Sequence, residues 1–191
     1  VIITGRIVQP QTAEKIIASG QADACGMTRA LICDADLPAK AREARTEDIR
    51  ACIGCNQACI GHFFLGAPIS CIQNPLSGRE VFHAPAVRAD VAKSVMVVGG
   101  GPAGMKAAVE AAMRGHKVQL LEATGQLGGQ ARLAQLLPGR AEFGGLITNL
   151  QHELSRAKVQ ITLNAHVTPY TVGKAAPDAV IIATGATPRP A

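Results

Sequence analysis

The chain has 191 residues, of which 48% are hydrophobic and 17% charged, and its net charge is +5. This length allows one or two domains, and the composition is typical of a globular chain rather than a disordered one. Aromatic residues make up only 3%, with no Trp, which argues against a surface that stacks nucleic-acid bases. No apolar run approaches the roughly 18 residues that a membrane span needs, so no membrane partner is expected.

The cysteines and the first residue indicate the redox environment of the protein and whether the chain is part of a longer one. A group of cysteines without a signal peptide predicts a reducing, cytoplasmic environment. The chain starts at Val1, inside an expected strand and without an initiator Met. We therefore expect an internal fragment of a longer polypeptide.

The start of the chain predicts two strands joined by a helix. Residues 1–4 are an apolar run that predicts a buried strand. Residues 12–19 predict a helix with Thr12 as its N-cap, and residues 22–29 predict the second strand. This order predicts a parallel pair with a helical crossover. A polar, helical stretch is expected over residues 37–50, with a cap-like start at Thr46 that leads into Cys52.

Glycine and arginine follow both of these strands. Arg6 comes after the first strand, and Gly26 and Arg29 lie at the end of the second. Glycine lets a phosphate approach the backbone, and the planar guanidinium of arginine can donate several hydrogen bonds to that phosphate. In a (β/α)8 barrel the loops after strands 7 and 8 commonly bind phosphate. On the residues alone, solvated surface arginines are the simpler interpretation.

Four of the six cysteines form a motif with C-x2-C-x3-C-x11-C spacing. They are Cys52, Cys55, Cys59 and Cys71. Three thiols in one turn with a fourth from a returning loop predict a 4Fe–4S cluster, because such clusters are typically held by four thiolates. A structural zinc ion is the main alternative, although zinc ribbons usually show two separated C-x2-C pairs, and disulfides are a third. The other two, Cys25 and Cys33, are expected to be small buried side chains.

A second domain is predicted to open at residue 94, after a surface linker over residues 79–93. An apolar strand runs into Gly99-Gly-Gly101-Pro-Ala-Gly104, a G-x-G-x-x-G motif that opens a helix over residues 105–114. A second strand is predicted over residues 117–121. This context is that of a βαβ unit that binds a dinucleotide.

Each residue of the dinucleotide motif has a predicted role. Gly99 makes the turn, Gly101 lets a pyrophosphate reach the helix N-terminus, and Gly104 allows close packing of the helix on the strand. Glu122 follows the second strand and is expected to accept a hydrogen bond from a ribose 2′-hydroxyl and to repel a 2′-phosphate. We therefore expect the unphosphorylated adenosine of FAD, NAD or ADP.

Two later features favour FAD over NAD. Gly128-Gly129-Gln130 resembles the second glycine turn that flavoproteins place near the diphosphate, and residues 179–185 predict a buried strand that ends in Ala-Thr-Gly. Between them, a helix is expected over residues 142–156 and a strand over residues 159–163. On the residues alone, Gln130 and Arg140 are as well explained as ordinary polar loop residues as by contact with a cofactor. No histidine is assigned a chemical role.

In this order, the barrel-end strands, the cysteine motif and the glycine-rich domain resemble one family of iron–sulfur flavoenzymes. This is the 2,4-dienoyl-CoA reductase and trimethylamine dehydrogenase family, whose barrel is related to old yellow enzyme. The similarity covers essentially the whole chain. Its most telling segments are Thr4-Gly-Arg-Ile, Gly26-Met-Thr-Arg-Ala-Leu-Ile, Cys52-Ile-Gly-Cys-Asn-Gln-Ala-Cys, Gly128-Gly-Gln and Leu137-Pro-Gly139. The cysteine spacing is that of the dienoyl-CoA reductases, whereas the trimethylamine dehydrogenase form places the third cysteine one residue earlier.

The resemblance implies roles for particular residues. Arg6 and Arg29 would hold an FMN phosphate, the four motif cysteines would bind the cluster, and Gln57 would lie against FAD. The residues implied to contact FAD or its ADP portion are Ala103, Glu122, Gln130, Arg140 and Val167. In the reductases, hydride from NAD(P)H reduces FAD, single electrons cross the cluster, and FMN reduces the substrate. In the amine dehydrogenases, electrons run from FMN through the cluster to a carrier protein, and the glycine-rich domain binds ADP.

The resemblance also implies an α/β domain plan. Residues 1–50 would be the C-terminal end of a TIM-barrel FMN domain, 51–93 the cluster segment and linker, and 94–191 an incomplete Rossmann-like domain for FAD or ADP. The remaining barrel strands, with the substrate pocket, and the nicotinamide domain are expected in the same chain or a partner chain. A stand-alone electron-transfer subunit and a zinc-stabilised nucleotide-binding module are the alternatives. The substrate, an enoyl-CoA, a methylated amine or another molecule, is not determined by these residues.

Overall fold

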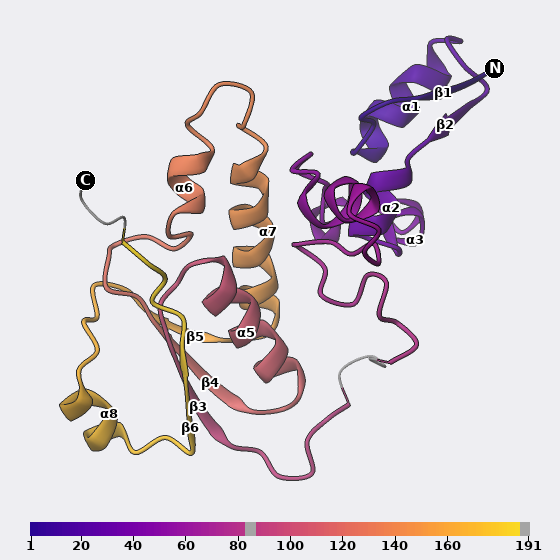
Figure 1. The fold of residues 1–191 in the computed structure, drawn as a ribbon. Helices are drawn as coiled ribbons and strands as arrows, with labels where there is room; N and C mark the ends of the chain where they lie inside the picture. The colour runs from indigo at the N-terminus through magenta and orange to yellow at the C-terminus, as the bar shows by residue number, and fades with distance from the viewer. Residues whose placement is uncertain (83–86, 188–191) are drawn as a thin grey trace. The chain divides into compact units, whose positions relative to one another are not determined.

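The computed structural model describes residues 1–82 and 87–187. The chain divides into two compact units, Val1–Ala84 and Pro85–Ala191 (Figure 1). Both contain helices and parallel β-sheet, which confirms the α/β class. No helix within the described ranges is long and apolar enough to cross a membrane. The linker expected over residues 79–93 lies partly outside these ranges.

The first unit begins with a parallel pair of strands. β1 (Ile2–Thr4) pairs with β2 (Ala24–Gly26), and α1 (Pro10–Ala18) connects them, as the order of elements predicts. The helix starts before the predicted Thr12 cap because Pro10 occupies its first turn. The fixed φ of proline suits that position, and proline has no N–H there that would need a partner.

Both strands of this pair differ from the prediction in detail. β1 is not buried, since Ile2 is 74% exposed and Ile3 is 36% exposed. A two-stranded sheet packed on one short helix leaves much of its surface open, so apolar character alone does not bury these side chains. β2 is shorter than the predicted range 22–29, because the chain enters the helix α2 (Thr28–Cys33) directly afterwards.

Short helical segments surround a small core in the rest of this unit. α2 is followed by α3 (Leu37–Arg42) and by η1, a 3-10 turn at Thr46–Asp48. The core consists of Ala30, Leu37 and Ile49, with Met27 and Ala41 packed against it. The helical stretch expected over residues 37–50 is interrupted: Ala44 adopts a left-handed φ of +56° beyond the end of α3, and η1 begins at Thr46.

The cysteine segment is mostly irregular. Gly54 and Asn56 have φ values of +64° and +59°, so the chain turns sharply between the first and third cysteines of the motif. η2 (Gln57–Gly61), a π-helical turn, then runs directly into α4 (His62–Phe64). Cys71 lies on the loop that follows, and Ser70 fastens this loop to η2 through a 2.8 Å backbone hydrogen bond to the Ala58 carbonyl.

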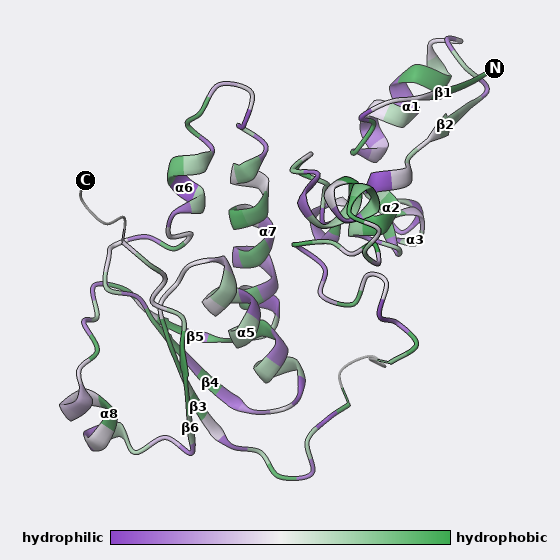
Figure 2. Ribbon diagram, viewed as in Figure 1, coloured by the Kyte–Doolittle hydropathy of each residue, from purple (hydrophilic) through white to green (hydrophobic). Residues whose placement is uncertain are grey.

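The second unit is built on a four-stranded parallel sheet. Its strands are β3 (Ser94–Val98), β4 (Lys117–Leu121), β5 (Gln160–Thr162) and β6 (Ala179–Ile182). They lie in the order β5-β4-β3-β6, and Figure 2 shows the apolar stretches of β3 and β4 at its centre. Because the order of strands reverses around β3, the loop after β3 lies where such sheets bind ligands.

Helices pack on this sheet and on one another. They are α5 (Pro102–Met113), α6 (Ala131–Ala134), α7 (Phe143–Arg156) and α8 (Pro169–Ala175). α5 packs on β3, β4, β6 and α7. The fully buried side chains of this unit include Val97, Met105, Val109, Leu120 and Leu154. Lys106 on α5 also reaches Glu153 on α7, with 3.0 Å between Nζ and Oε2.

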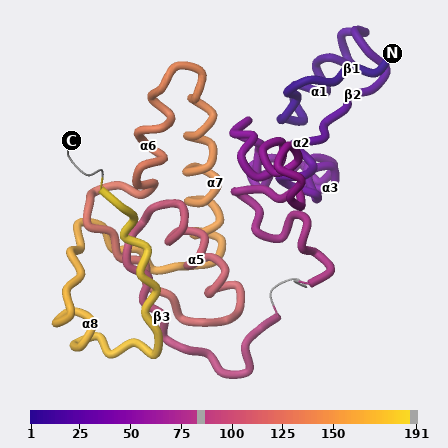
Figure 3. Tube along the Cα trace, viewed as in Figure 1, coloured from indigo at the N-terminus to yellow at the C-terminus, as the bar shows by residue number. Residues whose placement is uncertain are grey.

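The last strand departs from its predicted burial. Figure 3 follows the chain as it passes α8 and returns as β6 beside β3. α5 contacts β6, whereas Val180 and Ile182 alternate onto a face where they are 38% and 78% exposed. The buried strand expected over residues 179–185 is therefore a shorter, half-exposed strand at the edge of the described sheet.

Candidate functional site

Three glycines shape the loop between β3 and α5. Gly99 has φ +108°, and a Cβ there would lie 2.3 Å from the Ala183 carbonyl oxygen. A Cβ at Gly104 would lie 1.9 Å from the Gly99 carbonyl oxygen, so the helix approaches the turn as closely as glycine allows. A Cβ at Gly101 would meet nothing within 4 Å. Gly99 and Gly104 thus serve the fold, and Gly101 leaves open space at the start of α5.

The start of α5 is suited to an anion. Gly101 is the N-cap residue and offers no side chain to the first N–H groups of the helix. Those groups have no partner within the helix, and the helix dipole favours negative charge beside them. Ala103, for which the resemblance implies contact with the cofactor, lies in this first turn and is exposed.

Glu122 closes the glycine loop from the end of β4. Its Oε2 accepts a 2.6 Å hydrogen bond from the Gly100 N–H, and its Oε1 accepts 2.8 Å bonds from the N–H and the hydroxyl of Thr124. Burial acts to raise the pKa of this carboxyl, but the bonds from Thr124 and Gly100 outweigh burial and lower the pKa. The group is therefore a fixed carboxylate at the edge of the loop.

A second glycine turn interlocks with the first. The Gly128 N–H donates a 2.8 Å hydrogen bond to the Gly100 carbonyl. A Cβ at Gly129, where φ is +49°, would stand 3.1 Å from the Gly101 Cα. The Gln130 side-chain amide donates to the Ala186 carbonyl on the chain that leaves β6. The predicted residues Gly99, Gly101, Gly104, Glu122, Gly129 and Gln130 are thus gathered at one end of the sheet.

Two further predicted residues lie on connecting loops. Val167 is half-buried before α8, on the loop where the Ala165 N–H donates a 2.8 Å bond to the Glu122 carbonyl. Arg140 is exposed between α6 and α7, where its guanidinium stands 5.7 Å from the ring centre of Phe143. Their contact with a nucleotide stays a prediction.

Sequence reasoning missed Gly100, the central glycine of the loop. A Cβ there would lie 2.5 Å from a Leu127 methyl group and 3.0 Å from the Glu122 carboxylate. The signal was the run of three consecutive glycines, of which the fingerprint assigns roles to the outer two only.

The four motif cysteines are all free thiols and all partly exposed. The Gly54 N–H points at the Cys52 sulfur at 3.4 Å, and the Gln57 N–H donates to Cys55. Burial raises the pKa of Cys55, and the neighbouring Cys59, Cys71 and Cys52 act in the same direction. The thiols therefore lie within electrostatic reach of one another. Within residues 1–82 and 87–187, no three His, Cys, Asp or Glu side chains form a ready single-ion site.

Cys71 has a different environment from Cys55. A hydrogen bond from the Cys33 thiol lowers the pKa of Cys71 to about 6; burial opposes this effect, while the Gln73 and Asn74 N–H groups and the charge of Arg50 assist it. The same contact with Cys71, together with burial, raises the pKa of Cys33. The interpretation of Cys33 as only a small buried side chain is thus incomplete. Cys25 is half-buried, not fully buried, and its thiol donates to the Ala13 carbonyl at 3.8 Å.

The two predicted phosphate arginines lie against the cysteine loop. Arg29 donates a 2.7 Å hydrogen bond to the Asn56 side-chain oxygen. A Cβ at Gly54 would lie 3.5 Å from the Arg6 guanidinium. Gly26 ends β2, and Gln57 begins η2. Both cations are therefore close to the loop that carries the first three cysteines, and their role toward an FMN phosphate stays a prediction.

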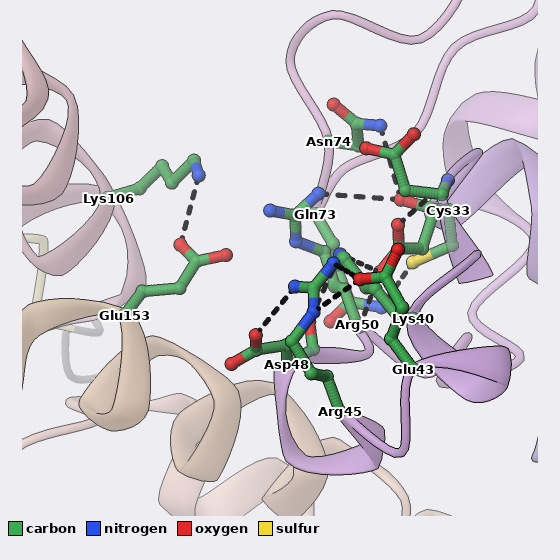
Figure 4. Close-up of polar contacts among 12 residues, drawn as sticks. Cys33, Lys40, Glu43, Arg45, Asp48, Arg50, Gln73, Asn74, Lys106 and Glu153 are labelled. Carbon is green, nitrogen blue, oxygen red and sulfur yellow. Dashed lines mark hydrogen bonds and ion pairs between the residues drawn. The ribbon is translucent and has the colours of Figure 1, made fainter. Parts of the chain in front are cut away.

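A polar network that the sequence did not reveal supports this loop (Figure 4). Buried Asp34 accepts bonds from Lys40 Nζ at 2.6 Å and from the Arg50 N–H at 2.8 Å. On the solvent side, Arg45 is paired with Glu43 and Asp48. These contacts hold the chain that leads into Cys52 against the helices before it.

Comparisons with known proteins agree with this geometry. The family model described as pyridine nucleotide-disulphide oxidoreductase matches residues 93–191. An NADH oxidase from Thermoanaerobacter brockii is 46% identical over 189 residues, which cover 98% of this chain and 29% of that protein.

Two solved structures match almost the entire chain. The structure of 2-naphthoyl-CoA reductase in complex with 2-naphthoyl-CoA matches with a TM-score of 0.94 and 37% identity. The match covers 99% of this chain and 29% of the reductase chain. Histamine dehydrogenase from Rhizobium sp. 4-9 matches with a TM-score of 0.92 and 36% identity. The match covers 100% of this chain and 28% of the dehydrogenase chain. The chain thus spans less than a third of the length of these relatives.

Proposed function

Because the chain belongs to the pyridine nucleotide-disulphide oxidoreductase family, we propose that it is the electron-relay part of an iron–sulfur flavoenzyme. The observation that carries the proposal is the presence of two donor sets in one chain. One set is the four motif cysteines, three of them around the turn at Gly54 and Cys71 on the loop after α4. The other is the pair of interlocked glycine turns closed by Glu122. In this proposal the chain lies between a nicotinamide cofactor and a substrate-reducing flavin.

The glycine turns fit a bound FAD. Gly101 leaves room for the pyrophosphate, and the first N–H groups of α5 would donate to it. Glu122 is held as a carboxylate at the end of β4, where it would accept from the adenosine ribose and repel a 2′-phosphate. Gln130 and Val167 border the same end of the sheet and would orient the rest of the cofactor.

The cysteine loop fits a 4Fe–4S cluster. Backbone N–H groups already point at the sulfurs of Cys52 and Cys55, and such hydrogen bonds stabilise the thiolates that bind iron. When bound, the flavin would supply hydride transfer and the cluster single-electron transfer. The protein contributes position, N–H donors and the nearby cations Arg6 and Arg29, which would also neutralise an FMN phosphate.

The proposal includes the domain plan expected from the sequence. Residues 1–50 would complete a TIM barrel that binds FMN, 51–93 would hold the cluster, and 94–191 would be part of the FAD domain. The rest of the barrel and a nicotinamide domain would be supplied by the same polypeptide or by a partner chain. The setting proposed is cytoplasmic, without a nucleic-acid or membrane partner.

An amine dehydrogenase is the second candidate function. The observation that favours it is the likeness to histamine dehydrogenase, whose TM-score of 0.92 nearly equals that of the naphthoyl-CoA reductase at 0.94. In that case the glycine site would hold ADP, and an electron-transfer protein would accept the electrons. A reductase would instead hold FAD and be reduced by NAD(P)H.

Cofactor analysis of the anaerobically purified protein tests the proposal. We expect iron and acid-labile sulfide in about a 4:4 ratio per chain, together with FAD whose absorbance bleaches with NADH or NADPH when the nicotinamide domain is present. ADP in place of FAD, with bleaching by an amine, would favour the second candidate. FMN in addition would indicate a completed barrel. A colourless protein that contains zinc would contradict both redox functions and leave a structural nucleotide-binding module.

Matched variants separate the two sites. Cys55→Ser should lose iron, and Cys25→Ser, which changes a cysteine outside the motif, should retain it. Gly101→Ala should fold but lose the bound nucleotide, because its Cβ enters the space left for the pyrophosphate. Gly145→Ala, which also meets nothing within 4 Å, should keep the nucleotide. Equal nucleotide content in both glycine variants would contradict the assigned site.

A further inference from the structure

Two buried polar side chains follow Cys71 on its loop. Gln73 and Ser77 are each 5% exposed, and Asn74 beside Gln73 is half-buried. Residues 67–78 contain no helix or strand. The position of Cys71 therefore depends on the individual contacts that hold this loop.

The loop after Cys71 is fastened to the end of α2. The last carbonyls of a helix have no partner within the helix. At the end of α2, the Asn74 amide donates to the Cys33 carbonyl at 3.2 Å, and the Ser77 hydroxyl donates to the Ile32 carbonyl at 2.5 Å. Figure 4 shows Asn74 and Gln73 beside Cys33. These side chains thus supply the partners that the helix lacks, and in doing so they anchor the loop.

Gln73 makes a second connection, to the segment that leads into Cys52. Its side-chain Nε2 donates to the Ala51 carbonyl at 3.0 Å and to the Cys33 sulfur at 3.3 Å. Ala51 directly precedes Cys52, and Gln73 lies two residues after Cys71. One side-chain amide therefore joins the two segments that carry the first and the last cysteine of the motif.

The acceptors determine which way the Gln73 amide points. A carbonyl can only accept, so the NH2 group of Gln73 faces Ala51, and its two hydrogens supply one bond to each acceptor. Because Gln73 is buried, water competes little for these bonds. The Gln73 Oε1 atom has no partner among the residues that the structure describes, so no donor there favours the opposite orientation. The connection between the two segments is thus specific to an amide.

We propose that Gln73 is a positioning residue that sets the separation of Cys52 and Cys71 and so prepares the cysteine loop for its cluster. This inference rests on the proposed function, in which these two cysteines are ligands of a 4Fe–4S cluster. Groups outside a ligand set orient the ligands, and their loss commonly lowers metal affinity about 10- to 100-fold. Gln73 acts through the Ala51 backbone and through its own loop, and it is not itself a ligand.

Replacement of Gln73 separates positioning from general stability. Gln73→Met keeps an unbranched side chain of similar length without an N–H donor. Ser77→Ala is the matched control, because it removes a buried donor to α2 from the same loop and leaves the bond to Ala51 intact. A role in stability alone predicts that the two variants behave alike. Gln73→Asn keeps the amide but is one methylene shorter, so it should not reach both acceptors.

The decisive measurement is the anaerobic release of iron from the cluster-loaded protein to a chelator. We expect release to be about tenfold faster in Gln73→Met than in the wild type, and Ser77→Ala to stay close to the wild-type rate. Denaturant unfolding should show comparable losses of stability in both variants, since each loses buried hydrogen bonds. Electron paramagnetic resonance of the reduced cluster gives a second readout, in which Gln73→Met should change the spectrum and Ser77→Ala should not.

The remaining outcomes separate this inference from the proposed function. Equal release from the wild type and Gln73→Met, or equal acceleration in Gln73→Met and Ser77→Ala, would overturn the positioning role. If Gln73→Met assembles no cluster, Gln73→Asn takes its place: faster release or loss of iron supports the proposal, and a wild-type rate contradicts it. A wild-type protein without iron and sulfide would reject the proposed function and this inference together. A loaded cluster that both Gln73 variants leave unaffected would reject the inference alone.

Discussion

The two units present donors to their ligands in opposite ways. The glycine site of the second unit is made of backbone, since Gly99, Gly101 and Gly129 bring peptide groups to the surface without side chains. The cysteine site of the first unit is made of side chains held by other side chains, as with Cys71 and Cys33. A backbone site depends on how tightly the elements pack. A side-chain site depends on polar partners and on its occupant.

The interiors of the two units show the same contrast. The second unit buries Val97, Met105, Leu120 and Leu154 between its sheet and helices. The core of the first unit is Ala30, Leu37 and Ile49, and buried Asp34 with its partner Lys40 lies close by in the chain. We therefore expect apolar packing to dominate the stability of the second unit, and polar contacts and the cluster to dominate that of the first.

Removal of the cluster should have the largest effect and should affect the first unit alone. Metal binding contributes directly to folding where the ligands lie on loops, and saturation at about 1,000 times the dissociation constant adds about 4.1 kcal/mol. Anaerobic chelation should make amides of residues 49–77 exchange with solvent about a thousandfold faster. Hydrogen exchange read by mass spectrometry measures both units at once, and β3, β4 and α5 are the internal control. Equal acceleration in both units would refute the contrast.

Gly104→Ala should be the most damaging single substitution in the second unit. Its Cβ would lie 1.9 Å from the Gly99 carbonyl oxygen, so α5 must move away from β3 at a cost of about 3 kcal/mol in unfolding free energy. Thermal unfolding measures the loss. Gly173→Ala is the control, because that glycine also lies in a helix but a Cβ there meets nothing within 4 Å. The control should be neutral or slightly stabilising, and similar losses in both would contradict the packing role.

Asp34→Ala should destabilise the first unit by about 2 to 3 kcal/mol. It leaves Lys40 and the Arg50 N–H without their buried acceptor, and breaking a buried pair is costly because the remaining charge is uncompensated. Denaturant unfolding, with amide exchange to assign the loss to this unit, measures the effect. Asp36→Ala removes an exposed carboxylate from the same loop and should change stability by less than about 0.5 kcal/mol. A larger effect from Asp36 would show that the network is misassigned.

Glu122→Gln should have the smallest effect and should appear as a change in pH dependence. The folded pKa of Glu122 is depressed. Its stabilising contribution is therefore present above the unfolded value of about 4.3 and is lost as the pH falls through the folded pKa. In melts between about pH 3 and 7, the wild type should lose this contribution on acidification, and the variant should lack it throughout. Thr124→Val removes one donor and should fall between them; parallel curves for all three would contradict the assignment.

The second unit was predictable because its signals are local. The bounds of β4 and α7 follow from apolar periodicity and from the glycines and charges beside them. The arrangement of Gly99 and Gly104 follows from a fingerprint whose spacing reflects contacts within one βαβ unit. The family of the chain was likewise recognisable from its motifs, as the relatives confirm.

The first unit was less predictable because its contacts are distant in sequence. The exposure of Ile2 depends on what covers the strand, which its own apolar character does not reveal. The break after α3 at Ala44 has no glycine or proline to mark it. The contact of Cys33 with Cys71 joins the end of α2 to a loop, and cysteine spacing within the motif says nothing about a thiol outside it.

Glu122 links the choice of cofactor to the mechanical integrity of the loop. The carboxylate that would discriminate against a 2′-phosphate is the same group that ties Gly100 and Thr124 in place. A lineage or an engineer that replaced it to admit NADP-like nucleotides would loosen both turns at the same time. A change in nucleotide preference would therefore need compensating substitutions around Thr124. Selectivity for or against the 2′-phosphate is expected to evolve through groups of substitutions rather than one at a time.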